Sequence, residues 1–529
     1  MTTLEEEAIA AKTATDADAP VSANASSKRL VKNVLMGYVT TLVTALTGFF
    51  TTPLLIRFLG SEQFGLWTML VSLLGYIGMV EVGTYTTVAK RVAECLASND
   101  RARLQRLIAT ASAMYLVMSA VAIFAVVSLS ALLPHLYPHL SQGEQHLAQK
   151  GLLLLGAFQC VTFLFAPQSA ILYGAGRSDL ISRTSALIGT TQAIVNVWLA
   201  LRGYGLLALC LSAIIGGVTG GVLLRHLARQ NIYKAGISLR GASWDMAREL
   251  LKYGSRYSFM SIAGAIGFSS DVLILGFMLP AAAITQYAVA SKLSGLVSLL
   301  AGKPISSVIP AFAHLETTGD RAGQFRLMVQ TGRAGVLISL PFVLSFCVFG
   351  DRIIHAWVGD GFQQSYPVMV ALALGVLLSA PAGPCVNLMI ATDKNLFLTR
   401  AYLVAALCNL GLSILLTKQF GIIGPALSTL IAIVGLELST LPIITCRLFG
   451  FSLRDFWTKM LLPMGLPALT ALAAALLMKS LPPTRPMTLV SLAIVIGACW
   501  VVWFRFSLGL EARQRLIKTV RQRFPHWNK

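Results

Sequence analysis

The chain has 529 residues, of which 56% are apolar and only 12% are charged. Soluble domains carry about 25% charged residues, so this composition excludes a soluble globular protein and predicts an all-α polytopic membrane protein. The net charge of +20 would indicate nucleic-acid binding in a soluble chain. Here the basic residues collect in the predicted loops on one side of the membrane, so no nucleic-acid partner is expected.

Fourteen apolar stretches are predicted to cross a bilayer, which takes about 20 residues as a helix; the stretch 336–349 is long enough only if it is extended. They are residues 34–56, 64–82, 107–133, 152–173, 181–201, 206–224, 257–279, 284–312, 336–349, 368–390, 396–416, 422–446, 460–478 and 487–506.

The basic residues assign an orientation to these stretches. With the N-terminus inside, 33 of the 42 Lys and Arg residues fall in inner regions or at the inner ends of the stretches, and seven fall in outer loops, while Lys292 and Lys303 stay within a helix. This asymmetry follows the positive-inside rule. It predicts an even number of spans with both termini in the cytoplasm.

The two halves of the chain resemble each other. The run YGLLALCLS, residues 204–212, matches FGIIGPALS, residues 420–428, 216 positions later. Six stretches separate the copies, so they share one orientation and form a parallel repeat, with a transport site expected between the halves. The predicted organisation is a disordered cytoplasmic tail (1–27), an N-terminal six-helix lobe (28–224), a basic cytoplasmic connector (225–256), a C-terminal six-helix lobe (257–446), two further helices (447–506) and a basic cytoplasmic tail (507–529).

Residues 268–303 form a predicted hairpin of two apolar helices that carries unusual charges. Asp271 lies in the first helix, and Lys292 and Lys303 lie in the second. The helical rise places Asp271 and Lys292 roughly 12 Å below the same membrane face. A charge at that depth is costly unless it meets a partner or a wet cavity, so these residues are functional candidates. The alternative is an ion pair that only holds the two helices together.

The connection between the first two stretches carries a recognisable motif. It reads Thr52-Pro53-Leu-Leu-Ile-Arg57-Phe-Leu-Gly60-Ser-Glu-Gln-Phe64-Gly65-Leu-Trp67, and Glu81 follows. Pro53 is expected to bend the helix, while Gly60 and Gly65 are expected to allow a tight turn.

With its evenly spaced loops and duplicated half, the chain resembles the polysaccharide transporter family (Wzx-like flippases of O-antigen and other lipid-linked oligosaccharides) of the MOP flippase superfamily. The resemblance runs from about residue 27 to the C-terminus, although Glu81 stands where the family more often has Asp. It implies two six-helix lobes around a central cavity that opens alternately to each side. It also implies a substrate that is a polyprenyl-diphosphate-linked oligosaccharide, the repeat unit of O-antigen, capsule or exopolysaccharide.

An anionic diphosphate needs cationic partners, whose attraction strengthens in a low-dielectric cavity. The candidate cations are Lys292, Arg57 and Lys303. For Arg57 and Lys303 the alternative is a side chain that extends to the membrane interface.

Three acidic residues lie within the apolar stretches, namely Asp271, Glu81 and Glu437. Intramembrane carboxyl groups mark proton relays and ion pathways, so each is a candidate for ion coupling or for a charge pair. The alternative is a structural carboxyl group bonded within the helices.

Other site classes are not expected. Gly295 and Gly302-Lys303 lack the spacing of a phosphate-binding loop, and no strand precedes them. His135, His139 and His146 are not accompanied by a carboxylate ligand set, which favours a polar loop over a metal site. No catalytic motif is apparent, so we expect a transporter with no cofactor. The tryptophans at the ends of predicted spans are interpreted as interfacial anchors: Trp67, Trp198, Trp357 and Trp503.

Two other functions remain as alternatives. A multidrug or toxin exporter of the same superfamily would need a cavity dominated by acidic residues. A membrane-embedded glycan polymerase or ligase would need a large outer loop with catalytic residues, and the outer loops here are modest. For a flippase, the expected partners are membrane lipids and the glycan polymerase or glycosyltransferases of the same pathway.

Overall fold

The computed structural model describes residues 23–232, 241–255, 270–306, 308–392, 394–482 and 484–507, in which helices are joined by short turns and there are no strands. The predicted all-α polytopic fold is confirmed. The helices are α2 (Ala23–Ala97), α3 (Arg101–Leu136), α4 (Gln142–Gly174), α5 (Ser178–Leu201), α6 (Gly205–Asn231), α8 (Asp271–Met278), α9 (Ala281–Ser306), α10 (Ile309–Thr317), α11 (Arg321–Val358), α12 (Ser365–Ser379), α13 (Gly383–Ala391), α14 (Asn395–Phe420), η1 (Gly421–Ile423), α15 (Gly424–Ala432), η2 (Ile433–Thr440), α16 (Leu441–Phe449), α17 (Leu453–Leu461), η3 (Leu462–Met464), α18 (Gly465–Lys479), α19 (Arg485–Val502) and η4 (Trp503–Ser507).

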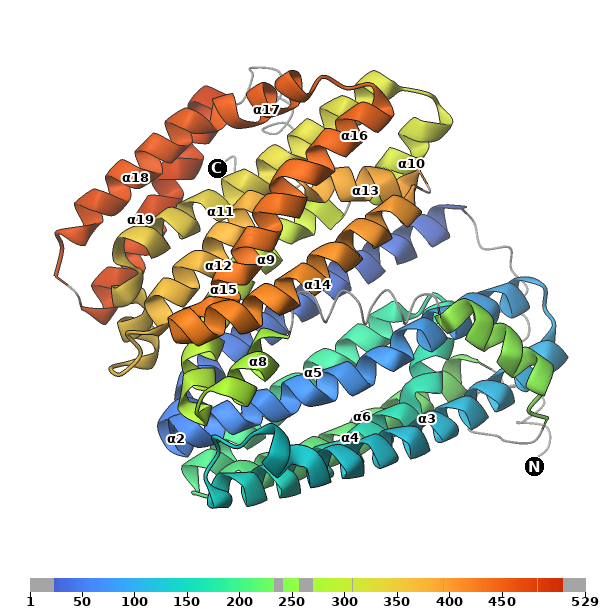
Figure 1. Ribbon diagram of the computed structural model, residues 1–529. Coiled ribbons are helices and arrows are strands. Elements are labelled where there is room, and N and C mark those ends of the chain that lie inside the picture. Colours follow the sequence, from blue (N-terminus) through green and yellow to red (C-terminus); the bar gives the residue numbers. More distant parts are fainter. Residues whose placement is uncertain are drawn as a thin grey trace, which may run out of the picture.

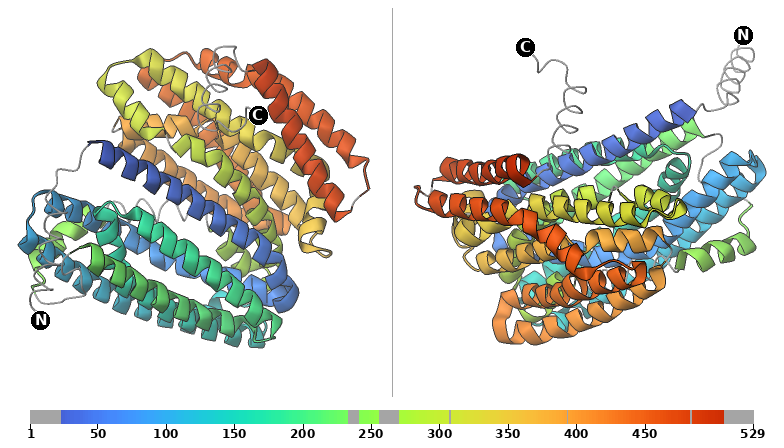
Figure 2. Two further views of the ribbon diagram at one scale, coloured as in Figure 1. Left: turned by 180° about the vertical axis from the view of Figure 1, so that it is seen from behind. Right: turned by 90° about the horizontal axis from the view of Figure 1, so that it is seen from above.

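The helices pack as two bundles (Figure 1). The first contains α3 to α6 together with α2, and the second contains α9 and α11 to α16. The α18–α19 pair packs on α11 at the edge of the second bundle, as both views in Figure 2 show. The limits of the predicted lobes stay a prediction, and α6 continues to Asn231, so the predicted connector begins as helix.

Nine helices of the described ranges are long and apolar enough to cross a membrane, or ten if the bent pair α12 and α13 is one span. The predicted total of fourteen is not established by this number. Most of the predicted stretch 257–279 lies outside the described residues, as do most of the two predicted tails. The apolar helices nevertheless identify a multi-pass membrane protein.

Gly60 interrupts α2 and reverses its direction. Its φ of 84° and ψ of 164° are non-helical and belong to a region that glycine adopts readily. The segments before and after this residue run in opposite directions, and both carry the α2 colours in Figure 1. The predicted turn at Gly60 is therefore present. The prediction for Gly65 was wrong, because this residue lies inside the helical second half of α2.

The structure adds detail to the sequence repeat. Gly205 and Gly421, which correspond in the alignment, both have positive φ, 69° and 63°. In the first bundle the Ser212 hydroxyl donates to Asn196 Oδ1 (2.6 Å). In the second bundle the corresponding Ser428 hydroxyl donates to the Asn409 carbonyl oxygen (2.7 Å).

A second pair of equivalent positions was not noticed in the sequence. Asp100 caps α3 by accepting a hydrogen bond from the Arg103 amide (2.9 Å), and Asp320 caps α11 by accepting one from the Gly323 amide (2.7 Å). Each follows a residue with positive φ, and the two motifs lie 220 positions apart. Both bundles therefore build the same turn at the same place.

The two bundles touch at the end of the molecule that carries Gly60. A Cβ atom added to Gly65 would lie 2.0 Å from the Ala281 carbonyl oxygen, so the two backbones are in direct contact. Beside this contact, the Thr285 hydroxyl donates to the Ser61 carbonyl oxygen. We call these four residues the closure. In the view of Figure 1 the bundles meet near the labels α2 and α8 and diverge toward α3 and α10.

The closure predicts a specific effect of Gly65→Ala. The added methyl group overlaps the Ala281 carbonyl group, so the variant should weaken the closure by about 1–3 kcal/mol, the usual cost of overpacking. We expect a pair of cysteines at positions 61 and 285 to cross-link several-fold less in the Gly65→Ala background. Gly75→Ala on the same helix is the control, since its added Cβ meets nothing within 4 Å. Equal cross-linking in the Gly65→Ala and Gly75→Ala backgrounds would contradict the proposed role of Gly65 in the closure.

Candidate functional site

One face of α9 combines a lysine with small residues. Lys292, Gly295, Ser298 and Gly302 recur every three to four positions, which places them on one side of the helix. All four are exposed. We call this face the α9 stripe. Small residues leave room beside the lysine, so a large ligand could approach its ammonium group.

The Lys292 side chain points toward α2. A Cβ atom on Gly48 would lie 3.5 Å from Lys292 Cε and 3.6 Å from Nζ. Among the described residues, Nζ has no hydrogen-bond acceptor and no carboxylate partner. The structure therefore places an exposed cation where α9 meets the first half of α2.

An aromatic contact adjoins this lysine. The rings of Phe49 in α2 and Trp357 in α11 stack at 4.9 Å with an interplanar angle of 13°. Trp357 Nε1 also donates to the Phe49 carbonyl oxygen (3.0 Å). The interpretation of Trp357 as only an interfacial anchor was therefore incomplete, because this residue ties the second bundle to α2. The position of Trp357 at the end of a predicted span did not indicate that it would contact Phe49.

Asp271 does not pair with Lys292 in this structure. Its carboxyl group is buried and accepts a hydrogen bond from the Tyr287 hydroxyl, and Thr429 of α15 lies close to the same group. Tyr287 and Lys292 are five positions apart on α9, which is about 140° around the helix, so they face different ways. The predicted ion pair is corrected to a carboxyl–phenol pair and a separate exposed cation.

The structure does not place the other two predicted cations, Arg57 and Lys303, beside Lys292. Arg57 is exposed, with its guanidinium group over the Phe58 ring at 5.9 Å. It is nine residues from Gly48, or about 13 Å along the helix. This geometry fits the alternative of an interfacial side chain. The side chain of Lys303 lies outside the described part of the structure.

Glu81 lines a cavity of about 560 Å³ inside the first bundle. Gln192 and Asn196 of α5 also line it. Their amides are linked through Ser212, whose hydroxyl accepts from Gln192 Nε2 (2.8 Å) and donates to Asn196 Oδ1 (2.6 Å). Tyr115 lies near enough to interact electrostatically with the Glu81 carboxyl group. The acidic side chain thus lines a largely apolar cavity that also contains amide and hydroxyl groups.

Glu437 lies in the second bundle within a π-helical segment, η2. Its Oε1 accepts a hydrogen bond from the Tyr402 hydroxyl of α14 (3.2 Å). The Thr440 hydroxyl donates to the carbonyl oxygen of Gly435, five residues earlier (2.7 Å), as the wider turn requires. π-Helical turns are rare and occur frequently at functional sites. The periodicity of the sequence did not predict this π-helical segment.

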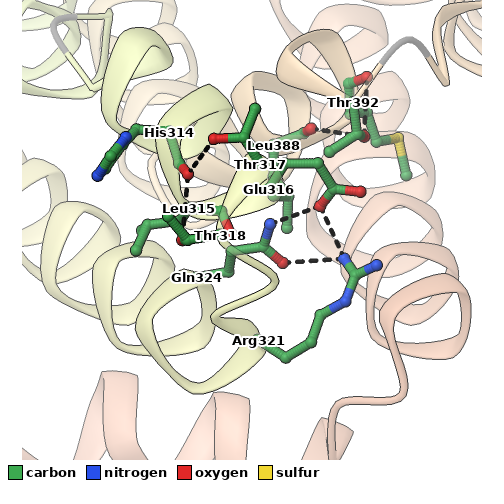
Figure 3. A network of polar contacts seen from close by, with 10 residues as sticks. His314, Leu315, Glu316, Thr317, Thr318, Arg321, Gln324, Leu388 and Thr392 are labelled. Atoms are coloured by element: carbon green, nitrogen blue, oxygen red, sulfur yellow. Dashed lines mark hydrogen bonds and ion pairs between the residues drawn. The ribbon is translucent and has the colours of Figure 1, made fainter.

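A further polar network joins α10, α11 and the loop between them (Figure 3). Glu316 Oε2 accepts from Arg321 (2.9 Å) and from Gln324 Nε2 (2.7 Å). Arg321 also lies over the Phe449 ring, and Lys394 lies over the same ring at 4.0 Å. These partners satisfy one another and fix α11 against α16, so we assign the network a structural role. Within the described ranges, no three His, Cys, Asp or Glu side chains come close enough to hold a metal ion.

Comparison with known families identifies the chain. The model of the family described as "Polysaccharide biosynthesis protein" matches residues 30–316, more than half of the sequence. The chain belongs to this family. The resemblance seen in the motif and the repeat is therefore confirmed.

Two curated relatives of this polysaccharide biosynthesis protein cover most of its length. A "Probable flippase AglR" from Haloferax volcanii is 25% identical over 78% of this chain and 80% of its own. A "Putative O-antigen transporter" from Shigella flexneri is 20% identical over 72% of this chain and 89% of its own.

Solved structures share the fold of this polysaccharide biosynthesis protein. A lipid II flippase, MurJ, in an inward closed conformation matches 89% of this chain and 99% of its own, with a TM-score of 0.69 and 16% identity. A MATE-family multidrug resistance transporter of the MOP superfamily, in an inward-facing conformation, matches 79% and 99%, with a TM-score of 0.61 and 11% identity. At these identities the comparisons speak for the fold alone.

The buried Asp271–Tyr287 pair predicts a stability effect. Tyr287→Phe removes the donor to a buried carboxyl group, which should destabilise the protein by about 1–3 kcal/mol. We expect a lower melting temperature of the purified protein in detergent. Tyr204→Phe is the control, because Tyr204 is 62% exposed. If both variants melt at the same temperature, the hydrogen bond contributes nothing to stability.

Proposed function

We propose that this protein is a flippase that moves a polyprenyl-diphosphate-linked oligosaccharide outward across the cell inner membrane by alternating access. The observation that carries the proposal is the exposed Lys292 on the α9 stripe, beside α2, where two repeated bundles meet. The family supports the same conclusion, as do the names of two curated relatives, a probable flippase and a putative O-antigen transporter.

Lys292 is the proposed contact of the substrate diphosphate. Anionic phosphate oxygens form strong charge-assisted hydrogen bonds with a cation, and the attraction grows in a low-dielectric surrounding. The small residues of the α9 stripe would leave space for the sugars that follow the diphosphate. Arg57 and Lys303 stay candidates for weaker contacts on either side of Lys292 along the path.

In this proposal, alternating access requires the closure to open and re-form. If both termini are cytoplasmic, the closure lies on the outer side and the bundles diverge toward the cytoplasm. The substrate would then enter between the bundles from the inner leaflet. Transport would require the contact between Gly65 and Ala281 to separate while the opposite ends approach.

Coupling to an ion is proposed at the intramembrane carboxyl groups. Glu81 lines a cavity that also contains the amides of Gln192 and Asn196, and Glu437 is hydrogen-bonded to Tyr402 in a π-helical turn. Protonation of either carboxyl group would change its contacts with the polar groups around it. Asp271 has a phenol partner instead of a cation, which makes it a third candidate for the same role.

The alternatives have less support. The fold is shared with multidrug transporters, but an exporter of that kind would need acidic residues to dominate the substrate path, where this chain exposes Lys292. A polymerase or ligase would need a large catalytic outer loop, and the outer connections here are short. A glycan polymerase or glycosyltransferases of the same pathway stay proposed partners.

The diphosphate contact predicts the behaviour of Lys292 variants. Lys292→Ala removes a charge-assisted bond worth about 1.5–3 kcal/mol, so transport should fall by about 10- to 100-fold. Lys292→Arg should retain part of it, since the charge survives with a different geometry. The measurement is outward movement of a polyprenyl-diphosphate-linked oligosaccharide in proteoliposomes, read with a membrane-impermeant reagent. Lys150→Ala, at an exposed lysine of α4, is the control. Wild-type transport by Lys292→Ala would reject this role.

The coupling proposal predicts the behaviour of two isosteric variants. Glu81→Gln and Glu437→Gln retain shape but cannot exchange a proton. At least one should lose most of its response to an imposed pH gradient, while its binding of substrate is retained. Transport is measured across a pH series with and without the gradient. If both variants keep the wild-type rate and pH dependence, neither residue carries the coupling proton.

A further inference from the structure

A pocket of about 680 Å³ lies at the closure end of the second bundle, apart from the α9 stripe. Three connections far apart in the sequence line it: the α8–α9 turn, the α11–α12 connection and the α14–η1 turn. The predicted topology places all three on the outer side of the membrane. Its volume is in the range of typical small-molecule sites, about 300–1,000 Å³.

The walls of this pocket are held in place. Gln286 Nε2 donates to the Gly361 carbonyl oxygen (2.6 Å), which links α9 to the α11–α12 connection. The Ser365 hydroxyl lies within hydrogen-bond distance of both the carbonyl oxygen and Oε1 of Gln286 (2.8 and 2.9 Å). A pocket fixed by its own hydrogen bonds does not have to be ordered by a ligand, which favours binding.

The chemistry of the lining suits a neutral, hydroxyl-rich ligand. Gln363 and Gln364 are exposed at the pocket. Within the described structure, their side-chain amides have no hydrogen-bond partner. Each amide can donate hydrogen bonds from its NH₂ group and accept them at its oxygen, so it can bind neighbouring sugar hydroxyls, which also donate and accept. No residue that lines the pocket is charged, so a phosphate group would be held there without a cationic partner.

An aromatic ring supplies the apolar part of the site. Phe420 is 55% exposed, and prolines at positions 280 and 367 line the same pocket. The flat face of a phenylalanine ring can pack against the C–H face of a sugar ring, which removes both from water. Amides beside an exposed ring form a site that is partly apolar and partly polar, as a sugar is.

We propose that this pocket binds the glycan part of the substrate on the outer side of the membrane, as a site separate from the diphosphate contact at Lys292. The inference rests on the proposed function, which supplies a glycan at this face. The pocket includes Pro280, which precedes Ala281 of the closure. A glycan bound there therefore contacts the turn at which the two bundles meet.

The test measures binding of neutral oligosaccharides without transport. The full-length protein in nanodiscs is titrated with a panel of neutral tri- to pentasaccharides, with saturation-transfer NMR as the readout. We expect at least one member to bind, and Gln363→Met/Gln364→Met and Phe420→Ala each to weaken it by about tenfold or more. Controls are Gln105→Met and Phe124→Ala, at exposed positions of α3 away from the pocket. Thermal melting of every variant shows that the fold is intact.

Several outcomes would overturn the inference. They are the absence of binding across the whole panel, equal binding by the pocket and control variants, competition by inorganic pyrophosphate, and occupation of the pocket by a phospholipid in native mass spectrometry. Lys292→Ala separates the two proposals, because it should lose transport and retain oligosaccharide binding. Oligosaccharide binding by a protein that does not transport would reject the flippase proposal alone. Transport without oligosaccharide binding would reject the pocket alone.

Discussion

The backbone contact between Gly65 and Ala281 fixes how closely the two bundles approach at one end of the molecule. Only a residue without a side chain fits there, because any Cβ would overlap the Ala281 carbonyl group. The contact brings α9 alongside α2, and this arrangement places Lys292 next to Gly48. The position of Lys292 beside Gly48 and the contact of Trp357 with Phe49 both depend on this approach of the second bundle to α2.

The intramembrane acidic groups share a second pattern. Asp271 and Glu437 each accept a hydrogen bond from a tyrosine hydroxyl, and Glu81 lies near Tyr115. A phenol donates to an ionised carboxylate and accepts from a neutral carboxylic acid, so it can serve either state. A lysine partner would favour only the ionised state. The separation of these groups from Lys292 therefore leaves the carboxyl groups free to change charge independently of the proposed substrate contact.

Much of the fold could be predicted from the sequence. Apolar stretches and the asymmetry of basic residues are consequences of the bilayer itself, and the repeat was visible in matching residues such as Tyr204 and Phe420. The separation of two residues along one helix can also be predicted, because the rise per residue is constant. The direction in which a side chain points around its helix depends on packing, and this is why the Asp271–Lys292 pair was predicted but not found. Gly65 shows the same limit, since a tight turn and a close helix contact both require glycine.

The π-helical segment from Ile433 to Thr440 affects the orientation of the helix that follows it. A π turn contains roughly one residue more than an α turn, and each residue of an α-helix corresponds to about 100° of rotation. The helix that follows, α16, therefore presents a different side to its neighbours than a continuous α-helix would. Loss of the extra residue from this turn would rotate α16 by about 100° relative to the helical segment that precedes it.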